Sequence, residues 1–151
     1  MSKARFSCTA IAALLFALPA AAQVTVTDPW IRGTVQGQMA TGAFMKLQSA
    51  KAARLVEAAS PVAGVVEIHE MKLEDNVMRM RAVTALDLPA GRSVELKPGG
   101  YHVMLMDLKQ QMKEGEVVPV TLLIESGGKR ETIEVKATVR APTARNETMK
   151  K

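Results

Sequence analysis

The sequence contains very little of several residue types on which common functions depend. Its 151 residues include one cysteine, two histidines and only 3% aromatic residues. Proteins that bind single-stranded nucleic acid stack bases on aromatic side chains, so this class is disfavoured. One cysteine and two histidines are too few for a zinc finger, and they leave little for a cysteine–histidine catalytic pair. The length fits a single globular domain.

The cysteine lies in a segment with the features of an export signal. Lys3 and Arg5 precede a short apolar run at residues 10–18, and three alanines stand directly before Gln23. A basic start, a short apolar run and small residues before a cleavage point are typical of a secretory signal peptide. The run is shorter than the roughly 20 apolar residues of a bilayer-spanning helix. We therefore predict a signal peptide over residues 1–22, cleaved before Gln23, and a periplasmic mature chain without a transmembrane segment.

Cleavage there would leave a mature chain without any cysteine. Cys8 precedes the apolar run instead of following it, which disfavours a lipoprotein anchor. Without cysteine, the mature chain has no disulfide, no thiol redox chemistry and no thiolate metal ligand.

Charge says little about partners. The formal net charge of +5 includes Lys3 and Arg5, and further basic residues gather near the C-terminus, so the body is close to neutral. We predict no nucleic-acid partner. Because the apolar alternation stops at Ala141, we predict a folded domain over residues 23–140 and a basic flexible tail over residues 141–151.

The region between these ends shows the alternation of apolar and polar residues that is typical of β-strands. Turn residues such as Pro98-Gly99-Gly100 separate the alternating segments. Some helical character occurs around residues 50–54. Many short strands without a helical stripe predict an antiparallel all-β sandwich or barrel. The predicted strands cover residues 24–27, 30–32, 40–48, 54–58, 64–71, 77–86, 93–97, 101–108, 117–125 and 130–139.

Methionine is the residue that is abundant, with ten in the chain. Successive side chains of a strand face opposite sides of its sheet. His102, Met104 and Met106 therefore share one face of their predicted strand, and His69 shares a face with Met71. Each of the two histidines has a methionine two residues away.

Taken singly, each methionine is best interpreted as a flexible core filler. Taken together with the histidines, the set has a more specific interpretation, because imidazole and thioether are donors that suit Cu(I) and make a poor zinc site. A blue-copper electron-transfer site would need a cysteine sulfur. We predict a site that holds monovalent copper without driving its redox cycle. With both histidines assigned to metal and no glycine-rich phosphate loop in the sequence, we predict that the protein is not an enzyme.

The spacing of these residues resembles a known signature. His69 is followed after ten residues by Met80, after a further twenty-one by His102, and after one more by Met104. This is similar to the H-x10-M-x21-H-x-M pattern of the PCu(A)C periplasmic copper chaperones. The similarity extends over about Val24 to Val139. The flanking segments that carry it are Asp-Pro-Trp-Ile-Arg at 28–32, His-Glu-Met at 69–71, Val-Met-Arg-Met at 77–80, and residues 96–106.

The resemblance implies a cupredoxin-like β-sandwich or Greek-key barrel that binds one Cu(I) per chain through His69, Met80, His102 and Met104. It also implies delivery of the copper to the CuA centre in subunit II of a haem–copper (cytochrome c) oxidase. A thiol-based copper chaperone would be a second partner. The alternative is a periplasmic copper-sequestering protein for tolerance, without a dedicated recipient, and the ligand set does not separate the two.

Two further points concern additional copper ligands. Met71 and Met106 face the same side as the four implied ligands, and they either act as reserve donors or only shield the site. Some members of the family carry a His- and Met-rich C-terminal extension for a second copper. Here the tail has Met149 and no histidine, which disfavours a second site for Cu(II).

Overall fold

The computed structural model describes residues 23–143, and all regular secondary structure in this range is β-strand. The predicted signal peptide and residues 144–151 of the predicted tail lie outside the described residues. No helix of the length and apolar character needed to cross a membrane occurs in the described range. The strands are β1 (Val24–Arg32), β2 (Ala40–Ser49), β3 (Ala53–Ala59), β4 (Ala63–Glu74), β5 (Val77–Ala82), β6 (Leu86–Leu88), β7 (Ser93–Leu96), β8 (Tyr101–Leu108), β9 (Val117–Ser126) and β10 (Lys129–Arg140).

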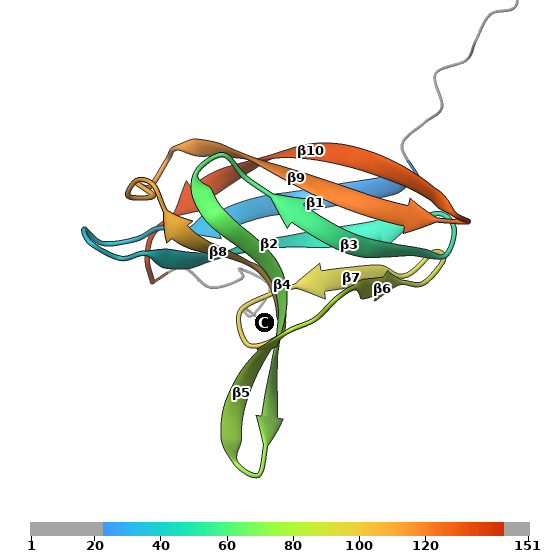
Figure 1. The fold of residues 1–151 in the computed structure, drawn as a ribbon, viewed down its shortest axis with the longest axis horizontal. Helices are drawn as coiled ribbons and strands as arrows, with labels where there is room; N and C mark the ends of the chain where they lie inside the picture. Colours follow the sequence, from blue (N-terminus) through green and yellow to red (C-terminus); the bar gives the residue numbers. More distant parts are fainter. Residues whose placement is uncertain (1–22, 144–151) are drawn as a thin grey trace, which may run out of the picture.

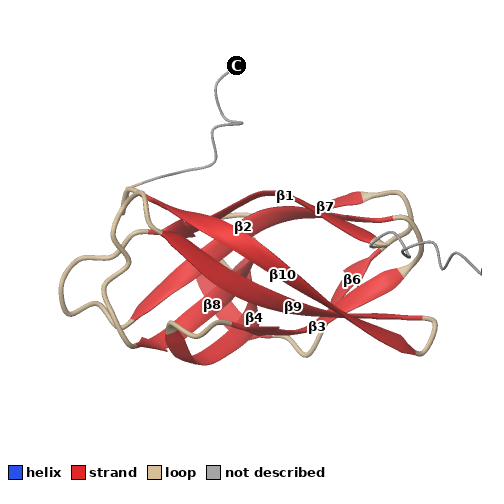
Figure 2. Ribbon diagram, turned by 90° about the horizontal axis from the view of Figure 1, so that it is seen from above, coloured by secondary structure: helices blue, strands red, loops and turns tan. Residues whose placement is uncertain are grey.

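The strands form one continuous sheet that folds over itself into a sandwich (Figures 1 and 2). The strand order is β5-β4-β8-β2-β1-β10-β9-β3-β6, and β7 pairs with β2. The pairs are antiparallel, except that β1 and β10 run parallel. The predicted antiparallel all-β sandwich is confirmed.

The core is built from the alternation seen in the sequence. On β9 every second residue from Val118 to Ile124 is buried, and on β8 Val103 and Leu105 are fully buried. These side chains belong to one hydrophobic cluster that includes strands from both ends of the sheet order. Burial of each large apolar side chain contributes about 1.5–3 kcal/mol of transfer free energy. The sandwich therefore stabilises β8, the strand that carries His102 and Met104.

Three local predictions differ from the structure. Residues 77–86 were expected as one strand, but β5 ends at Ala82 and β6 begins at Leu86, because the chain leaves the β4–β5 pair there and crosses to pair with β3. The expected strands at 24–27 and 30–32 are one strand, β1, with an irregularity after Thr27. The helical character around 50–54 is absent, since β3 begins at Ala53.

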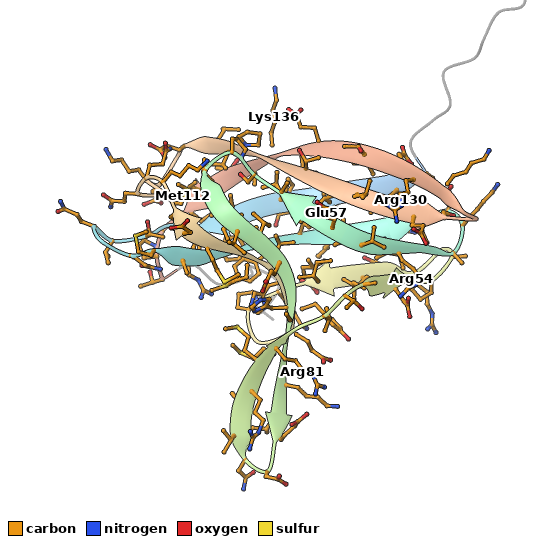
Figure 3. All side chains as sticks on the ribbon, in the orientation of Figure 1. Arg54, Glu57, Arg81, Met112, Arg130 and Lys136 are labelled. Carbon is orange, nitrogen blue, oxygen red and sulfur yellow. The ribbon has the colours of Figure 1, made fainter. Side chains whose placement is uncertain are left out.

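The β4–β5 hairpin extends away from the body of the sandwich (Figure 1). A two-residue loop joins its strands, and Asp75 and Asn76 have φ values of +50° and +60°. Positive φ at both central residues is the type I′ geometry that matches the twist of a hairpin. Arg81 lies on this projecting element (Figure 3).

A second turn sets the start of β8. The Gly100 N–H donates to the Lys97 carbonyl at 3.0 Å, and Gly99 between them has a φ of +85°. Proline at the second position and glycine at the positive-φ third position are typical of a type II turn. The turn delivers the chain into β8 at Tyr101, one residue before His102.

We expect Gly99→Ala to lower the free energy of unfolding by about 1 kcal/mol, because an L-residue is disfavoured in the left-handed region. Gly100→Ala is the matched control. A Cβ on Gly100 would lie 3.6 Å from Lys97 Cγ, an ordinary van der Waals distance, so we expect a change within about 0.5 kcal/mol. Urea denaturation of the two variants measures the difference. Equal losses would contradict the assigned turn.

Candidate metal centre

Strand register brings the histidines together. β4 and β8 pair antiparallel with His69 directly opposite His102, and the centroids of the two rings are 5.8 Å apart. Both side chains are buried. The two histidines of the chain therefore lie side by side on one face of the sheet, although 33 positions separate them in the sequence.

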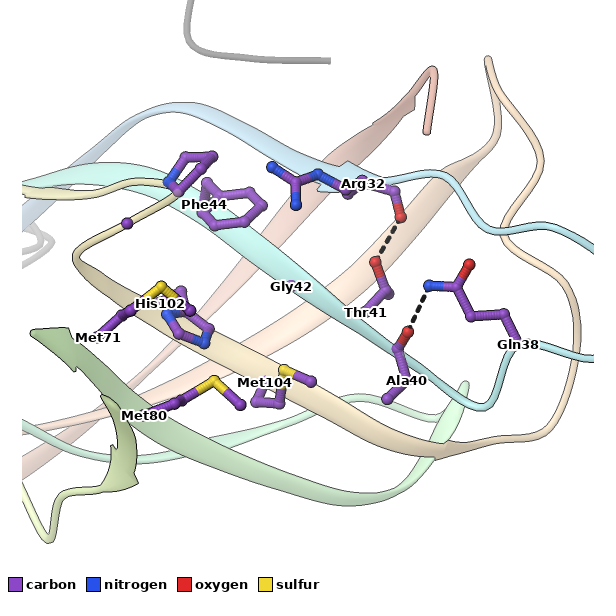
Figure 4. Close-up of a pocket in the computed structure, with 12 residues that line it drawn as sticks. Arg32, Gln38, Ala40, Thr41, Gly42, Phe44, Met71, Met80, His102 and Met104 are labelled. Atoms are coloured by element: carbon purple, nitrogen blue, oxygen red, sulfur yellow. Dashed lines mark hydrogen bonds between the residues drawn. The ribbon is translucent and has the colours of Figure 1, made fainter. Parts of the chain in front are cut away.

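Methionines from three strands, β4, β5 and β8, surround this point. On the β4–β5 hairpin Met71 is directly opposite Met80. Met104 lies two residues beyond His102 on β8, on the same face. Figure 4 shows the side chains of Met71, Met80 and Met104 around the ring of His102. These four residues line one pocket with a volume of about 360 Å³.

The predicted site residues are placed unequally around this pocket. Met80, His102 and Met104 line it, together with the auxiliary candidate Met71. His69 is absent from the lining but is in ring contact with His102. Met106, the other auxiliary candidate, also lies outside the lining. It is half-buried two residues further along β8, where it pairs with Ala40 and Val65.

Hydrogen bonding fixes which nitrogen of His102 is free. The ring Nδ1 is 3.0 Å from the Gly100 carbonyl oxygen, and a carbonyl only accepts, so Nδ1 carries the hydrogen. In the neutral ring the lone pair then falls on Nε2. Burial lowers the pKa of His102, the Gly100 hydrogen bond opposes this, and the nearby His69 and Arg32 lower it further. Lowering of the pKa keeps the ring neutral, the form that binds metals, at more acidic pH.

His69 shows the complementary arrangement. Its Nε2 lies 2.8 Å from a carboxylate oxygen of Glu67, which can only accept when ionised, so the lone pair of the neutral ring falls on Nδ1. That Nδ1 is buried and has no hydrogen-bond partner among the described residues. Buried polar atoms without a partner are rare because they lose free energy. A carboxylate behind a histidine is the usual way in which metal-binding imidazoles are oriented.

The donor set distinguishes between classes of metal. No aspartate or glutamate is found among the described residues that line the pocket. Nor does any group of three or more His, Cys, Asp or Glu suited to a metal ion occur within residues 23–143. Calcium and magnesium need oxygen donors, and structural zinc sites need thiolates or further imidazoles. Two imidazole lone pairs beside thioethers fit a soft monovalent ion such as Cu(I).

Two residues that sequence reasoning did not assign complete the pocket wall. The Arg32 guanidinium lies over the Phe44 ring, 5.4 Å from its centroid, and the Arg32 Nε is buried without a partner in the described chain. Phe44 in turn lies 6.2 Å from the His102 ring, centroid to centroid. Arg32 ends the Asp-Pro-Trp-Ile-Arg segment, but no local pattern indicates that a side chain at the end of β1 lines the same pocket as those of β8, which is separated from β1 by β2.

The sandwich and this pocket together define a cupredoxin-like domain with a histidine–methionine site. The family model described as "Putative lipoprotein LpqE-like" matches residues 24–139, and the chain belongs to this family. The lipoprotein Lxx21020 of Leifsonia xyli, which is also described as putative, is 31% identical over 135 residues. That match covers 79% of this chain and 81% of the relative.

Solved structures with the same fold include domains that carry the PCuAC name. The apo PCuAC domain of PmoF2 has a TM-score of 0.66 at 26% identity, covering 83% of this chain and 96% of that domain. A copper-bound form of the PmoF2 domain is similarly related, with a TM-score of 0.65 at 25% identity. Apo-DR1885 from Deinococcus radiodurans has a TM-score of 0.61 at 31% identity, covering 93% and 94% of the two chains. Its CuI form is 32% identical, with a TM-score of 0.58. The predicted cupredoxin-like fold is confirmed, and these neighbours support the resemblance to PCuAC proteins.

We expect the two imidazoles of the metal-free protein to be opposite tautomers, Nε2–H for His69 and Nδ1–H for His102. Nitrogen-15 correlation spectra of the histidine rings measure this directly. Glu67→Ala removes the acceptor for His69, so only the His69 signals are expected to move toward a tautomer mixture, with His102 as the internal control. The same tautomer in both rings would contradict the hydrogen bonds described above.

Proposed function

We propose that the protein is a periplasmic copper carrier that binds one Cu(I) per chain. The ligands would be Nδ1 of His69, Nε2 of His102 and the sulfur atoms of Met80 and Met104. The observation that carries this proposal is the buried Nδ1 of His69, which has no hydrogen-bond partner within residues 23–143. It belongs to a ring that contacts His102, which lines the pocket with the thioethers.

Three observations support copper and its monovalent state. The similar structures include a copper-bound PCuAC domain and a CuI form of DR1885. The donors are neutral and soft, as Cu(I) prefers. The Arg32 cation and the lack of carboxylates among the described lining residues disfavour divalent ions, because Arg32 repels an added positive charge, and the Glu67 carboxylate is hydrogen-bonded to Nε2 of His69 outside the lining.

The distribution of exposure suits a carrier. The two histidines are buried, whereas Met80 is 47% exposed on the projecting hairpin. A partner can therefore reach the copper through Met80 while the imidazoles hold it from behind. Thioethers have no proton to lose or gain at ordinary pH, so their release of Cu(I) needs no acid–base chemistry on the side of this protein. The protein binds and releases its cargo and catalyses no reaction in this scheme.

We further propose delivery to the CuA centre in subunit II of a haem–copper oxidase, with a thiol-based chaperone as a second partner. Export is supported by the word lipoprotein in the descriptions of the family and of the L. xyli relative. We propose a signal peptide at residues 1–22 that is cleaved before Gln23. Because Cys8 lies before the apolar run, we do not propose a lipid anchor on it.

Sequestration for tolerance is the alternative to delivery. Loss of oxidase activity on gene deletion, rescued by added copper, would support delivery. Copper sensitivity with normal oxidase would support sequestration.

Titration of residues 23–151 with Cu(I) against a competing chelator tests the site. We expect one tight equivalent, with mixed nitrogen and sulfur neighbours in X-ray absorption. The His102→Ala/Met104→Ala variant should bind Cu(I) more than about 100-fold more weakly. Loss of a residue that only hydrogen-bonds to a metal ligand already lowers metal affinity by about 10–100-fold, and this variant loses two ligands. Met106→Ala is the matched control, because Met106 shares the β8 face but lies outside the pocket. Indifference to the double substitution would refute this ligand set.

Substitution of Arg32 tests the charge argument. We expect Arg32→Glu to raise the affinity for Zn(II) and Cu(II) relative to Cu(I) by at least about tenfold, because it replaces a repulsive charge with an attractive one. Arg32→Gln should give a smaller shift of the same sign. Competition titrations with the three ions measure the ratio. An unchanged ratio in both variants would show that Arg32 does not select the charge of the bound ion.

A further inference from the structure

One face of the β4–β5 hairpin is a continuous surface of apolar and sulfur-containing side chains. The register pairs Leu73 with Met78 and Met71 with Met80. Directly paired residues lie side by side on the same face of an antiparallel pair. The opposite face carries charged residues, with ion pairs such as Arg81–Glu70 at 3.2 Å and Arg79–Glu74 at 3.8 Å. Figure 3 shows how far this element stands out from the sandwich.

The apolar face is open to solvent. The exposed fractions are 59% for Leu73, 50% for Met78 and 47% for Met80. β5 lies at the end of the strand order, with β4 as its neighbour. A methionine that fills a gap in the core would be buried, as Met112 is. Core packing therefore does not explain the sulfur of Met78.

We propose that Met71, Met78 and Met80 form an outer Cu(I) site on the hairpin, made only of thioethers, through which copper enters and leaves the inner pocket. This inference rests on the proposed carrier function. The Cβ atoms of Met71 and Met80 are expected about 4.5–5.5 Å apart, and those of the diagonal pair Met71 and Met78 about 7–8 Å apart. Three-bond thioether side chains are long and flexible enough to converge over such distances, and Cu(I) accepts thioether ligands.

The two sites share one ligand, Met80. Met71 and Met80 line the inner pocket, and Met78 does not. Copper can therefore move inward by stepwise ligand exchange while Met80 stays bound. Nε2 of His102 replaces the sulfur of Met78, the sulfur of Met104 replaces that of Met71, and Nδ1 of His69 then adds as the fourth ligand. Two metal–ligand bonds break and three form, the copper remains Cu(I), and no proton moves. Because the sites share Met80, one copper is bound at equilibrium, and the outer site is occupied only in transit.

Met78 is not a ligand of the inner site, so its sulfur is expected to change the rates at which Cu(I) enters and leaves and not the affinity of the inner site for Cu(I). We expect Met78→Leu, which keeps the apolar side chain and removes the sulfur, to slow Cu(I) transfer to a chelator and from it. The expected factor is about tenfold in both directions, with an unchanged dissociation constant. Met39→Leu is the matched control, because Met39 is 53% exposed and lies outside the hairpin. Stopped-flow exchange with a coloured Cu(I) chelator measures both rates.

The outer site can also be isolated. In the His102→Ala/Met104→Ala background we expect weak residual Cu(I) binding with an X-ray absorption spectrum dominated by sulfur. Met78→Leu should abolish this binding, and Leu73→Met, which adds a sulfur opposite Met78, should strengthen it. If Met78→Leu changes neither the exchange rates nor the residual binding, the outer site is refuted and the carrier function is unaffected.

If the unmodified protein does not bind Cu(I) tightly, the carrier function is refuted. Residual sulfur binding that depends on Met78 would still support the outer site in that case.

Discussion

The pairing of His69 with His102 across β4 and β8 is the constraint on which the candidate site depends. A one-residue slip between these strands would turn one imidazole to the other face of the sheet. It would also separate Met71 and Met80 from Met104, since the hairpin follows β4. The register is held by the buried residues that alternate with the site on β8, Val103 and Leu105. Core packing thus positions the candidate metal donors.

The site combines a rigid half and an open half. β8 and its neighbour β2 lie within the sandwich, and hydrogen bonds that the rings donate to the Gly100 carbonyl and the Glu67 carboxylate orient the imidazoles. The hairpin contributes its methionines from outside the body, where Met78 and Met80 contact solvent. Ordered nitrogen donors can hold an ion in place, and exposed sulfur donors let a partner reach it. A fully buried set of the same ligands would bind copper but would release it slowly.

The sequence predicts the local features well because they depend on neighbouring residues. The alternation in 101–108 matches β8, and the Pro-Gly-Gly turn has the expected geometry. The prediction of one strand over residues 77–86 is wrong because the alternation of apolar and polar residues continues where the chain stops pairing with β4 and crosses to β3. Arg32 and Phe44 reach the pocket from β1 and β2, and only tertiary structure shows this. Which ring nitrogen of each histidine carries the lone pair likewise depends on the hydrogen bonds to Glu67 and Gly100 in the folded chain.

Charge bears on how strongly the proposed site would hold its ion. The proposed imidazole and thioether ligands are neutral and would not offset the charge of Cu(I), and Arg32 adds a second positive charge among lining residues that include no carboxylate in the described chain. A thiolate site would neutralise the ion and hold it more strongly. In the proposed site, affinity would come mainly from soft-donor bonding, so an acceptor with an anionic ligand would have an electrostatic advantage over it. Under that proposal, the charges of the two ligand sets would favour transfer from this site to such an acceptor.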